Sequence, residues 1–132
     1  MILSYLFDTD RVIDFLNAQP DAHHLVARFL PAGIAISIVT YAELLEGILG
    51  SHDVAEGERE LHAFLRSVAV LDISRPVARR VAEIRLDLRH RGRPVNNRIA
   101  DLFIAATALH HDLMLVTRNT RDYEDIPGLV VH

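Results

Sequence analysis

Acidic and amide side chains stand at four distant points of this 132-residue sequence, each beside an expected strand or helix start. Asp8 ends a short apolar run, and Asn119 and Asp122 lie in a polar segment that follows another such run. Glu43 and Asp101 fall in the first turns of two expected helices. Clustered carboxylates repel one another unless a cation neutralises them. Oxygen ligands suit Mg²⁺ or Mn²⁺ rather than zinc, and the chemistry expected of such a site is phosphodiester hydrolysis.

Short apolar runs alternate with helical patterns along the chain, which favours an α/β fold with a mainly parallel sheet. The expected strands are 4–7, 34–37, 69–73, 113–117 and, at the sheet edge, 129–131. The expected helices are one capped at 9 or 10 and broken at 20, then 21–30, 40–50, 58–68, 74–92 and 96–109. Sites in such sheets form beyond the carboxyl ends of the strands. We therefore expect all four polar points to lie at that edge.

Each acid also has a local explanation that needs no common site. Thr40 and Glu43 have the spacing of a capping box, in which the threonine accepts a backbone N–H and the glutamate reaches back. Asp101 follows Asn96 or Asn97, either of which can cap a helix, and a first-turn aspartate suits the helix dipole. Four independent local explanations would make it a coincidence that all of these residues meet at one sheet edge. We therefore favour a shared site.

The composition is that of an ordinary soluble globular protein, and the length predicts one domain spanning 1–132. No cysteine is present, which excludes disulfides, thiolate metal sites and cysteine nucleophiles. The first residues lack the basic region of a signal peptide, and no uncharged apolar run approaches membrane-spanning length. We therefore expect a cytoplasmic protein.

The charge distribution is more informative than the net charge of −4, which argues against binding nucleic acid by bulk electrostatics. All fourteen basic residues are arginine, and the sequence has no lysine. Eight arginines share one segment: Arg75, Arg79, Arg80, Arg85, Arg89, Arg91, Arg93 and Arg98. Arginine suits bidentate phosphate contacts, and a solvated helix face explains the segment equally well.

Four motifs resemble those of the PIN-domain ribonucleases, and in particular the VapC toxins of bacterial type II toxin–antitoxin systems. The matching segments are LFDT at 6–9, TYAEL at 40–44, DLFIAATA at 101–108 and LVTRN at 115–119. They span essentially the whole chain in the family order, and the motif at 101–108 is the most specific. The resemblance implies a three-layer α/β/α fold with four to five strands and a divalent-metal-dependent endoribonuclease. It also implies a homodimer or a toxin–antitoxin hetero-oligomer, and neutralisation by a small cognate VapB-like antitoxin.

By this resemblance, Asp8, Glu43 and Asp101 match the three near-invariant acids of the family, whose implied role is to bind Mg²⁺ or Mn²⁺ and so activate water. Asn119 stands where many members have a fourth acid. Its amide oxygen can act as a ligand but brings no charge, and Asp122 is the lower-ranked substitute.

Three further polar residues adjoin these motifs. Asp10 stands where the family usually has asparagine or serine, and it either supports the site or caps a helix. The hydroxyls of Thr9 and Thr117 are candidate donors that orient the acids, or they stabilise a turn and a cap.

Other functions compete with this interpretation. Residues 7–12 resemble the opening motif of haloacid-dehalogenase-type phosphatases, with Asp8 as nucleophile and Asp10 as acid/base. That chemistry normally needs a lysine, which is absent, and it leaves Glu43 and Asp101 unexplained. A housekeeping PIN nuclease and a PIN-like scaffold that only binds a partner also compete, and Asn119 is the feature that encourages the scaffold.

The partner hypothesis rests on two apolar stretches, 12–30 and 48–65. They form either a groove for an amphipathic antitoxin segment or ordinary core-facing helices, and the sequence leaves both possibilities open.

Overall fold

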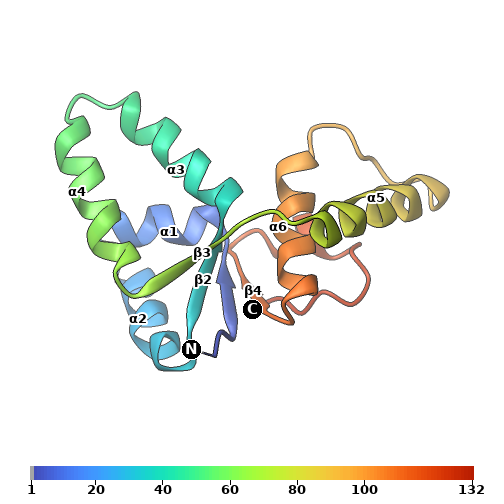
Figure 1. Ribbon diagram of the computed structural model, residues 1–132, viewed down its shortest axis with the longest axis horizontal. Coiled ribbons are helices and arrows are strands. Elements are labelled where there is room, and N and C mark those ends of the chain that lie inside the picture. The colour runs from blue at the N-terminus through green and yellow to red at the C-terminus, as the bar shows by residue number, and fades with distance from the viewer. Residues whose placement is uncertain (1) are drawn as a thin grey trace.

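The computed structural model describes residues 2–132 and places four strands in one sheet (Figure 1). The strands are β1 (Tyr5–Phe7), β2 (Ile34–Ser37), β3 (Val68–Leu71) and β4 (Met114–Val116), in the spatial order β3-β2-β1-β4. Every neighbouring pair is parallel. The predicted α/β fold with a parallel sheet is therefore confirmed. Because β1 and β4 are neighbours, the first and last strands of the chain lie side by side in the sheet.

The edge strand expected at 129–131 is reduced to one parallel bridge between Leu115 and Val131. Leu115 donates its N–H to the Val130 carbonyl at 2.9 Å and accepts from the His132 N–H at 2.8 Å. These bonds seat the C-terminal segment against β4 without extending the sheet by a full strand.

Helices connect the strands and lie on both faces of the sheet. They are α1 (Thr9–Leu16), α2 (Pro20–Phe29), α3 (Ile38–Leu49), α4 (Val54–Leu65), α5 (Arg75–His90) and α6 (Ile99–His110), with 3₁₀ turns η1 (Leu30–Ala32) and η2 (Thr120–Tyr123). None of these helices within residues 2–132 is both long and apolar enough to cross a membrane.

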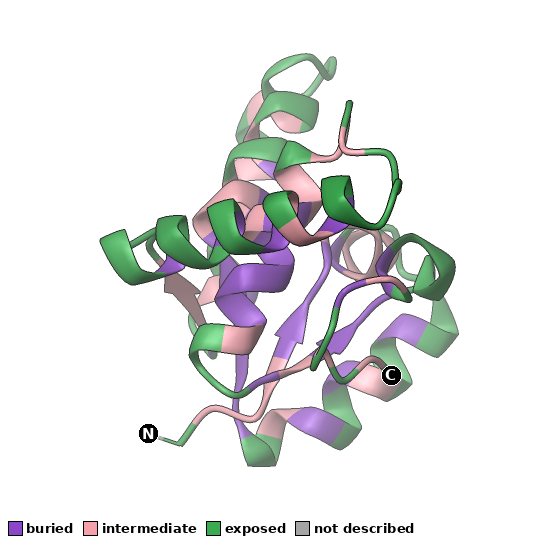
Figure 2. Ribbon diagram, turned by 90° about the vertical axis from the view of Figure 1, so that its right-hand side faces the viewer, coloured by how far each residue is buried: buried purple, intermediate pink, exposed green. Residues whose placement is uncertain are grey.

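Alternating strand residues divide the core into two parts, one on each face of the sheet. Figure 2 shows the largely buried strands between helices on the two sides. Phe7 packs in the part covered by α1 to α4, and its neighbour Leu6 packs in the part covered by α5 and α6. Both side chains are fully buried. Successive side chains of a strand point to opposite faces, so a short apolar run without alternating polar residues is what a doubly covered sheet requires. The three-layer α/β/α arrangement follows.

The starts of α1 and α3 differ from the predicted caps. Ser37 caps α3, since its hydroxyl accepts from the Val39 N–H at 3.1 Å, and Thr40 lies buried inside the helix. The capping box of Thr40 and Glu43 was therefore a wrong prediction, because a better-placed serine ends β2 just upstream. Asp8, rather than Thr9 or Asp10, caps α1 by accepting from the next backbone N–H at 2.8 Å.

Two other helix starts also differ from the prediction. Helix α4 begins at Val54 because Asp53 caps it, accepting from the Glu56 N–H at 3.1 Å. Arg98 directly precedes α6 and makes no side-chain capping bond. Asn97 has a left-handed φ of 62°, which places it in the turn before the helix rather than at the cap.

Candidate active site

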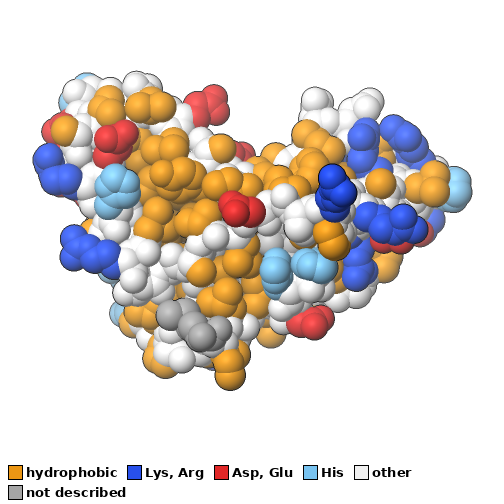
Figure 3. All heavy atoms as spheres, viewed as in Figure 1, with side chains coloured by type: hydrophobic (Ala, Val, Ile, Leu, Met, Phe, Trp, Pro, Cys, Tyr) orange, Lys and Arg blue, Asp and Glu red, His pale blue; other side chains and the backbone are white. Residues whose placement is uncertain are grey.

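The carboxyl ends of β1 and β4 place Asp8 and Thr117 side by side at one edge of the sheet. Asp8 follows β1 and donates its backbone N–H to the Val116 carbonyl at 2.9 Å. The Thr117 hydroxyl, which follows β4, donates to Asp8 Oδ2 at 2.9 Å. Helices α3 and α6 both begin near this edge of the sheet (Figure 1). In the view of Figure 3 the outline of the molecule is hollowed between the arm of α3 and α4 and the arm of α5 and α6.

Asp8 is a buried carboxylate, 6% exposed, that accepts three hydrogen bonds. Its donors are the Thr9 N–H at 2.8 Å, the Thr117 hydroxyl at 2.9 Å and the Tyr123 hydroxyl at 3.0 Å. Burial raises the pKa of Asp8 to about 6, and the nearby charge of Asp10 adds to this, while the hydrogen bonds act in the opposite direction. Holding the charged form of Asp8 in this buried place therefore costs the fold stability.

Asp101 lies in the first turn of α6, half-buried and connected to Asp8 through Tyr123. The Tyr123 hydroxyl is 3.3 Å from Asp101 Oδ1, so one phenol links acids from two distant segments. Burial raises the pKa of Asp101, and the charges of Asp122 and Glu43 raise it further. The structure therefore brings these acids close enough for their charges to interact.

Glu43 is held toward the same region by Thr9. The Thr9 hydroxyl donates to Glu43 Oε1 at 2.7 Å and lies 3.0 Å from the hydroxyl of Thr40, which can donate to it in turn. Thr40 is fully buried inside α3, so the rigid helix fixes the position of this chain of hydroxyls. Glu43 thus turns toward the site rather than back to the start of its own helix.

The fourth position is the most open part of the site. Asn119 is exposed, and it contacts the site through its backbone N–H, which donates to the Thr117 hydroxyl at 3.1 Å. Asp122 is also exposed and lies in η2, where its charge acts on Asp101. The structure therefore places both candidates next to the three acids without drawing either side chain in among them.

Asp10 supports the loop after β4 instead of capping a helix. Its Oδ2 accepts from the Arg118 N–H at 3.0 Å and lies 3.3 Å from the Thr117 hydroxyl. Asp10 therefore ties α1 to the segment that carries the fourth position.

Sequence reasoning missed Tyr123. Its ring is buried, 2% exposed, and its hydroxyl contacts two of the three predicted ligands. Burial raises the pKa of the phenol, and the charges of Asp8 and Asp101 raise it further, so the hydroxyl stays protonated. Tyr123 lies within the polar loop expected at 118–123, and the sequence there carries no signal of this contact.

The oxygen donors of Asp8, Glu43 and Asp101 are of the kind that a hard divalent cation binds, but their side chains do not yet surround a common point. Within residues 2–132, no three acidic or histidine side chains are arranged to hold a metal ion as they stand. The acids are instead joined through hydroxyls, Tyr123 between Asp8 and Asp101, and Thr9 on Glu43. Oxygen donors with excess negative charge are the ligands that Mg²⁺ and Mn²⁺ take in proteins.

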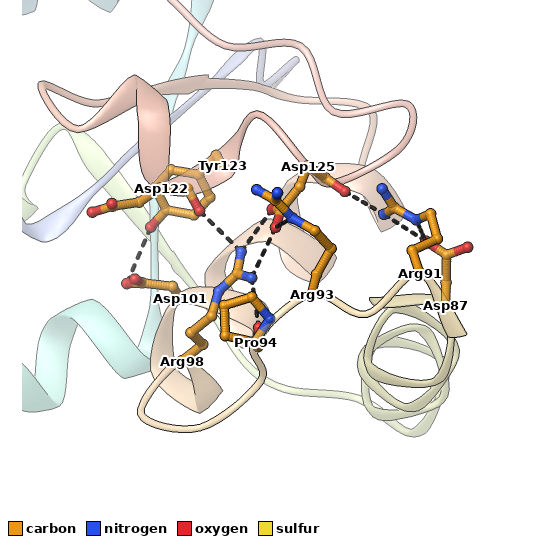
Figure 4. Close-up of polar contacts among 9 residues, drawn as sticks. All are labelled: Asp87, Arg91, Arg93, Pro94, Arg98, Asp101, Asp122, Tyr123 and Asp125. Carbon is orange, nitrogen blue, oxygen red and sulfur yellow. Dashed lines mark hydrogen bonds and ion pairs between the residues drawn. The ribbon is translucent and has the colours of Figure 1, made fainter. Parts of the chain in front are cut away.

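A polar cavity of about 350 Å³ opens beside Asp101. Its lining consists of Arg93, Pro94, Asn97, Arg98, Asp101, Arg121, Asp122 and Asp125. Arg98 donates to the carboxylate of Asp125 through both terminal nitrogens, at 2.7 and 2.9 Å, and to the Asp122 carbonyl at 3.1 Å (Figure 4). Its guanidinium thereby fastens the start of α6 to η2 and the residues that follow it.

Part of the arginine-rich segment is used within the fold. Arg93 and Arg98 bind Asp125, and Arg91 binds Asp87 on α5 and the Asp125 carbonyl. Four others are exposed on α5: Arg75, Arg79, Arg80 and Arg89. Figure 3 shows arginines gathered over this helix at the right of the view.

Comparison with known proteins shows which family this chain belongs to. The PIN domain pattern matches residues 5–129. The chain belongs to the PIN-domain family. Ribonuclease VapC2 of Rickettsia felis is 30% identical over 129 residues, which cover 96% of this chain and 95% of that protein. The tRNA(fMet)-specific endonuclease VapC of Shigella flexneri is 30% identical over 128 residues, covering 97% of this chain and 96% of that protein.

Solved structures of the family have the same fold. The VapBC2 complex of R. felis bound to a promoter DNA fragment contains a chain with a TM-score of 0.88 and 27% identity, covering 98% of both chains. DNA-bound VapBC of Salmonella typhimurium gives 0.88 and 29%, covering 99% of this chain and 98% of that one. The expected PIN-domain ribonuclease of the VapC type is confirmed.

Proposed function

We propose that this protein is an endoribonuclease that depends on a divalent metal and acts in the cytoplasm as the toxin of a type II toxin–antitoxin pair. The observation that supports this most strongly is the buried Asp8, tied by hydroxyls to acids from other parts of the chain. Burying a carboxylate costs stability, and the cap of α1 uses only one of its two oxygens. Carboxylates joined in this way at the carboxyl edge of a parallel sheet are suited to a cation and a phosphodiester.

The residues that would hold Mg²⁺ or Mn²⁺ are Asp8, Glu43 and Asp101, with Asn119 as the fourth ligand and Asp122 as its substitute. A bound ion of this kind supplies a hydroxide near neutral pH and stabilises the charge on the leaving oxygen. The chain's own hydroxyls orient the acids. Thr117 and the Thr9 backbone fix Asp8, and the Thr9 side chain fixes Glu43.

The test is cleavage of RNA by the purified protein with Mg²⁺ or Mn²⁺ and with EDTA. A tRNA pool is a suitable first substrate, because a relative at 30% identity is named as a tRNA endonuclease. Asp8→Asn and Asp101→Asn should each abolish cleavage while the protein stays folded. Asp112→Asn is the matched control, because this exposed aspartate lies in the turn before β4, at the opposite end of that strand. Equal cutting by the Asp8 variant and its parent would refute the proposed site.

The partner of such a toxin is a small VapB-like antitoxin. A groove of about 340 Å³ runs between α1, α3 and α4 and reaches Glu43. Its lining includes Ile13 and Leu16 from α1, and Leu44 and Ile48 from α3. Ile13 is 43% exposed, so its side chain is accessible to a partner that enters this groove. We place an amphipathic antitoxin segment in this groove.

Growth and co-purification test the partner. Expression of the chain should arrest growth, and co-expression of the cognate antitoxin should relieve the arrest, whereas a housekeeping nuclease would show neither effect. Ile13→Glu should abolish co-purification, and Leu86→Glu, at a 54% exposed position on α5, is the matched control. Unchanged binding by the Ile13 variant would remove the groove from the proposal.

The RNA backbone is the substrate feature that exposed arginines can bind without sequence preference. We propose this role for Arg75, Arg79, Arg80 and Arg89 on α5. Replacing Arg79 and Arg80 by glutamine should weaken RNA binding and lower its dependence on salt, which a filter-binding titration at several salt concentrations measures.

A further inference from the structure

The Tyr123 hydroxyl lies between Asp8 and Asp101 and is not one of the proposed metal ligands. It lies 3.0 Å from Asp8 Oδ2 and 3.3 Å from Asp101 Oδ1. A phenol has one proton to donate, so the two carboxylates share one donor. Because the ring is almost fully buried, the hydroxyl reaches the acids from the core.

The two acids depend on Tyr123 to different degrees. Asp8 keeps two other donors, the Thr9 N–H and the Thr117 hydroxyl, if the phenol is removed. Within the described residues, Tyr123 is the one side chain that hydrogen-bonds to Asp101. The orientation of Asp101 relative to Asp8 therefore rests on this hydroxyl.

The phenol is fixed in place from two sides. Its ring belongs to the core on the α5 and α6 face, together with Leu102 of α6 and Ile126. The backbone beside it is held by Arg98, which binds the Asp122 carbonyl at 3.1 Å and the Asp125 carboxylate (Figure 4). Arg98 directly precedes the helix that carries Asp101, so the same contact fixes the acid and the phenol relative to each other.

We propose that Tyr123 is a positioning residue that orients Asp101 toward Asp8 and thereby sets the affinity of the site for a divalent cation. The inference rests on the proposed function, since it requires these acids to be metal ligands. Hydrogen bonds from neighbouring groups commonly orient metal-binding carboxylates, and their loss weakens metal affinity about 10- to 100-fold.

The experiment measures Mn²⁺ binding by the purified full-length protein, from the electron paramagnetic resonance signal of free Mn²⁺, without RNA. Tyr123→Phe keeps the ring and removes only the oxygen. We expect its Kd for Mn²⁺ to rise about tenfold. The loss of hydrogen bonds to two carboxylates should also lower the Tm of the metal-free protein, so binding is measured at a temperature where the variant is fully folded. Tyr5→Phe is the matched control, because Tyr5 stacks on Phe29 at the start of β1, away from the acids. Its Kd should equal that of the parent.

The outcomes separate the inference from the proposed function. If the parent binds Mn²⁺ and Tyr123→Phe binds it equally or more tightly, the inference is overturned and the metal site stands. If the parent does not bind Mn²⁺, or Asp8→Asn binds it as well as the parent, the proposed site itself fails. A role in packing alone predicts no change for Tyr123→Phe, since phenylalanine fills the same space. A tenfold loss therefore supports orientation by the hydroxyl.

Discussion

Replacing Asp125 by asparagine should destabilise the protein, because the carboxylate anchors the segment that carries Tyr123. The Asp125 side chain is 8% exposed, and it accepts from Arg98 at 2.7 and 2.9 Å and from Arg93 at 3.2 Å. An amide keeps one oxygen and turns an NH₂ group toward a guanidinium, so at least one charged hydrogen bond is lost. Such a bond contributes about 1.5–3 kcal/mol. We expect a loss of about 2–3 kcal/mol, or a fall in Tm of roughly 6–12 °C for a chain of this size.

Urea denaturation in EDTA measures this effect, and Asp87→Asn is its control. Asp87 pairs with Arg91 at 2.7 Å, but the two side chains are 44% and 41% exposed. A surface pair of this kind contributes less than about 1 kcal/mol. Both variants remove one charge and keep the side-chain shape, so the difference between them isolates the effect of burial. The reasoning is wrong if Asp125→Asn costs no more than Asp87→Asn.

The pH dependence gives a second check on the same variant. The hydrogen bonds from Arg98, with a smaller effect from those of Arg93, hold the pKa of Asp125 below its usual value. The contribution of Asp125 to stability is therefore fully present above the unfolded-state pKa of about 3.9 and is lost as the pH falls through the folded-state pKa. The difference between parent and Asp125→Asn should be constant from about pH 5 to 8 on this basis and shrink below about pH 4. A gap that persists undiminished in acid would assign the effect to shape rather than charge.

Three further substitutions have expected outcomes. Because the pKa of Asp8 is raised to about 6, its charge opposes folding at neutral pH, so Asp8→Asn in EDTA should stabilise the protein by roughly 1–3 kcal/mol at about pH 7.5 and by little at about pH 4, as thermal melts can show. Gly33 has a φ of 92°, and a Cβ there would lie 2.1 Å from the Ile2 carbonyl oxygen, so Gly33→Ala should cost at least about 2 kcal/mol in urea denaturation. Asn119→Asp supplies the charge that the fourth position lacks and should tighten Mn²⁺ binding by roughly tenfold, whereas a side chain that stays in solvent would leave the Kd unchanged.

Most of the strands were predictable because they depend on local patterns, whereas the three-layer arrangement was implied by the family resemblance. The strand from Ile34 to Ser37 agrees with its prediction, since the run is apolar, rich in β-formers and bounded by Gly33 on one side and a helix on the other. The segment 129–131 is also a short apolar run, but it pairs over one residue only. Its neighbour β4 is short, and no sequence pattern reports how far a partner strand extends.

Tyr123 lay beyond prediction for a different reason. Its hydroxyl is defined by two acceptors at positions 8 and 101, brought to it by β1 and α6. A tyrosine in a polar loop is ordinary, and it becomes part of the site only because its ring is buried while its oxygen meets two acids. Contacts of this kind depend on tertiary geometry, which the spacing of residues along the chain does not predict.

A helix-capping role is compatible with a place in the site for Asp8 but not for Glu43. Asp8 is both the cap of α1 and the buried acid, because one oxygen accepts the backbone N–H while the other faces Thr117 and Tyr123. For Glu43 the two accounts exclude each other, since a carboxylate that reaches back to cap its own helix cannot bind Thr9. Ser37 decides between them. By capping α3 three residues before Thr40, it moves Glu43 into the second turn and frees its carboxylate to face the other acids.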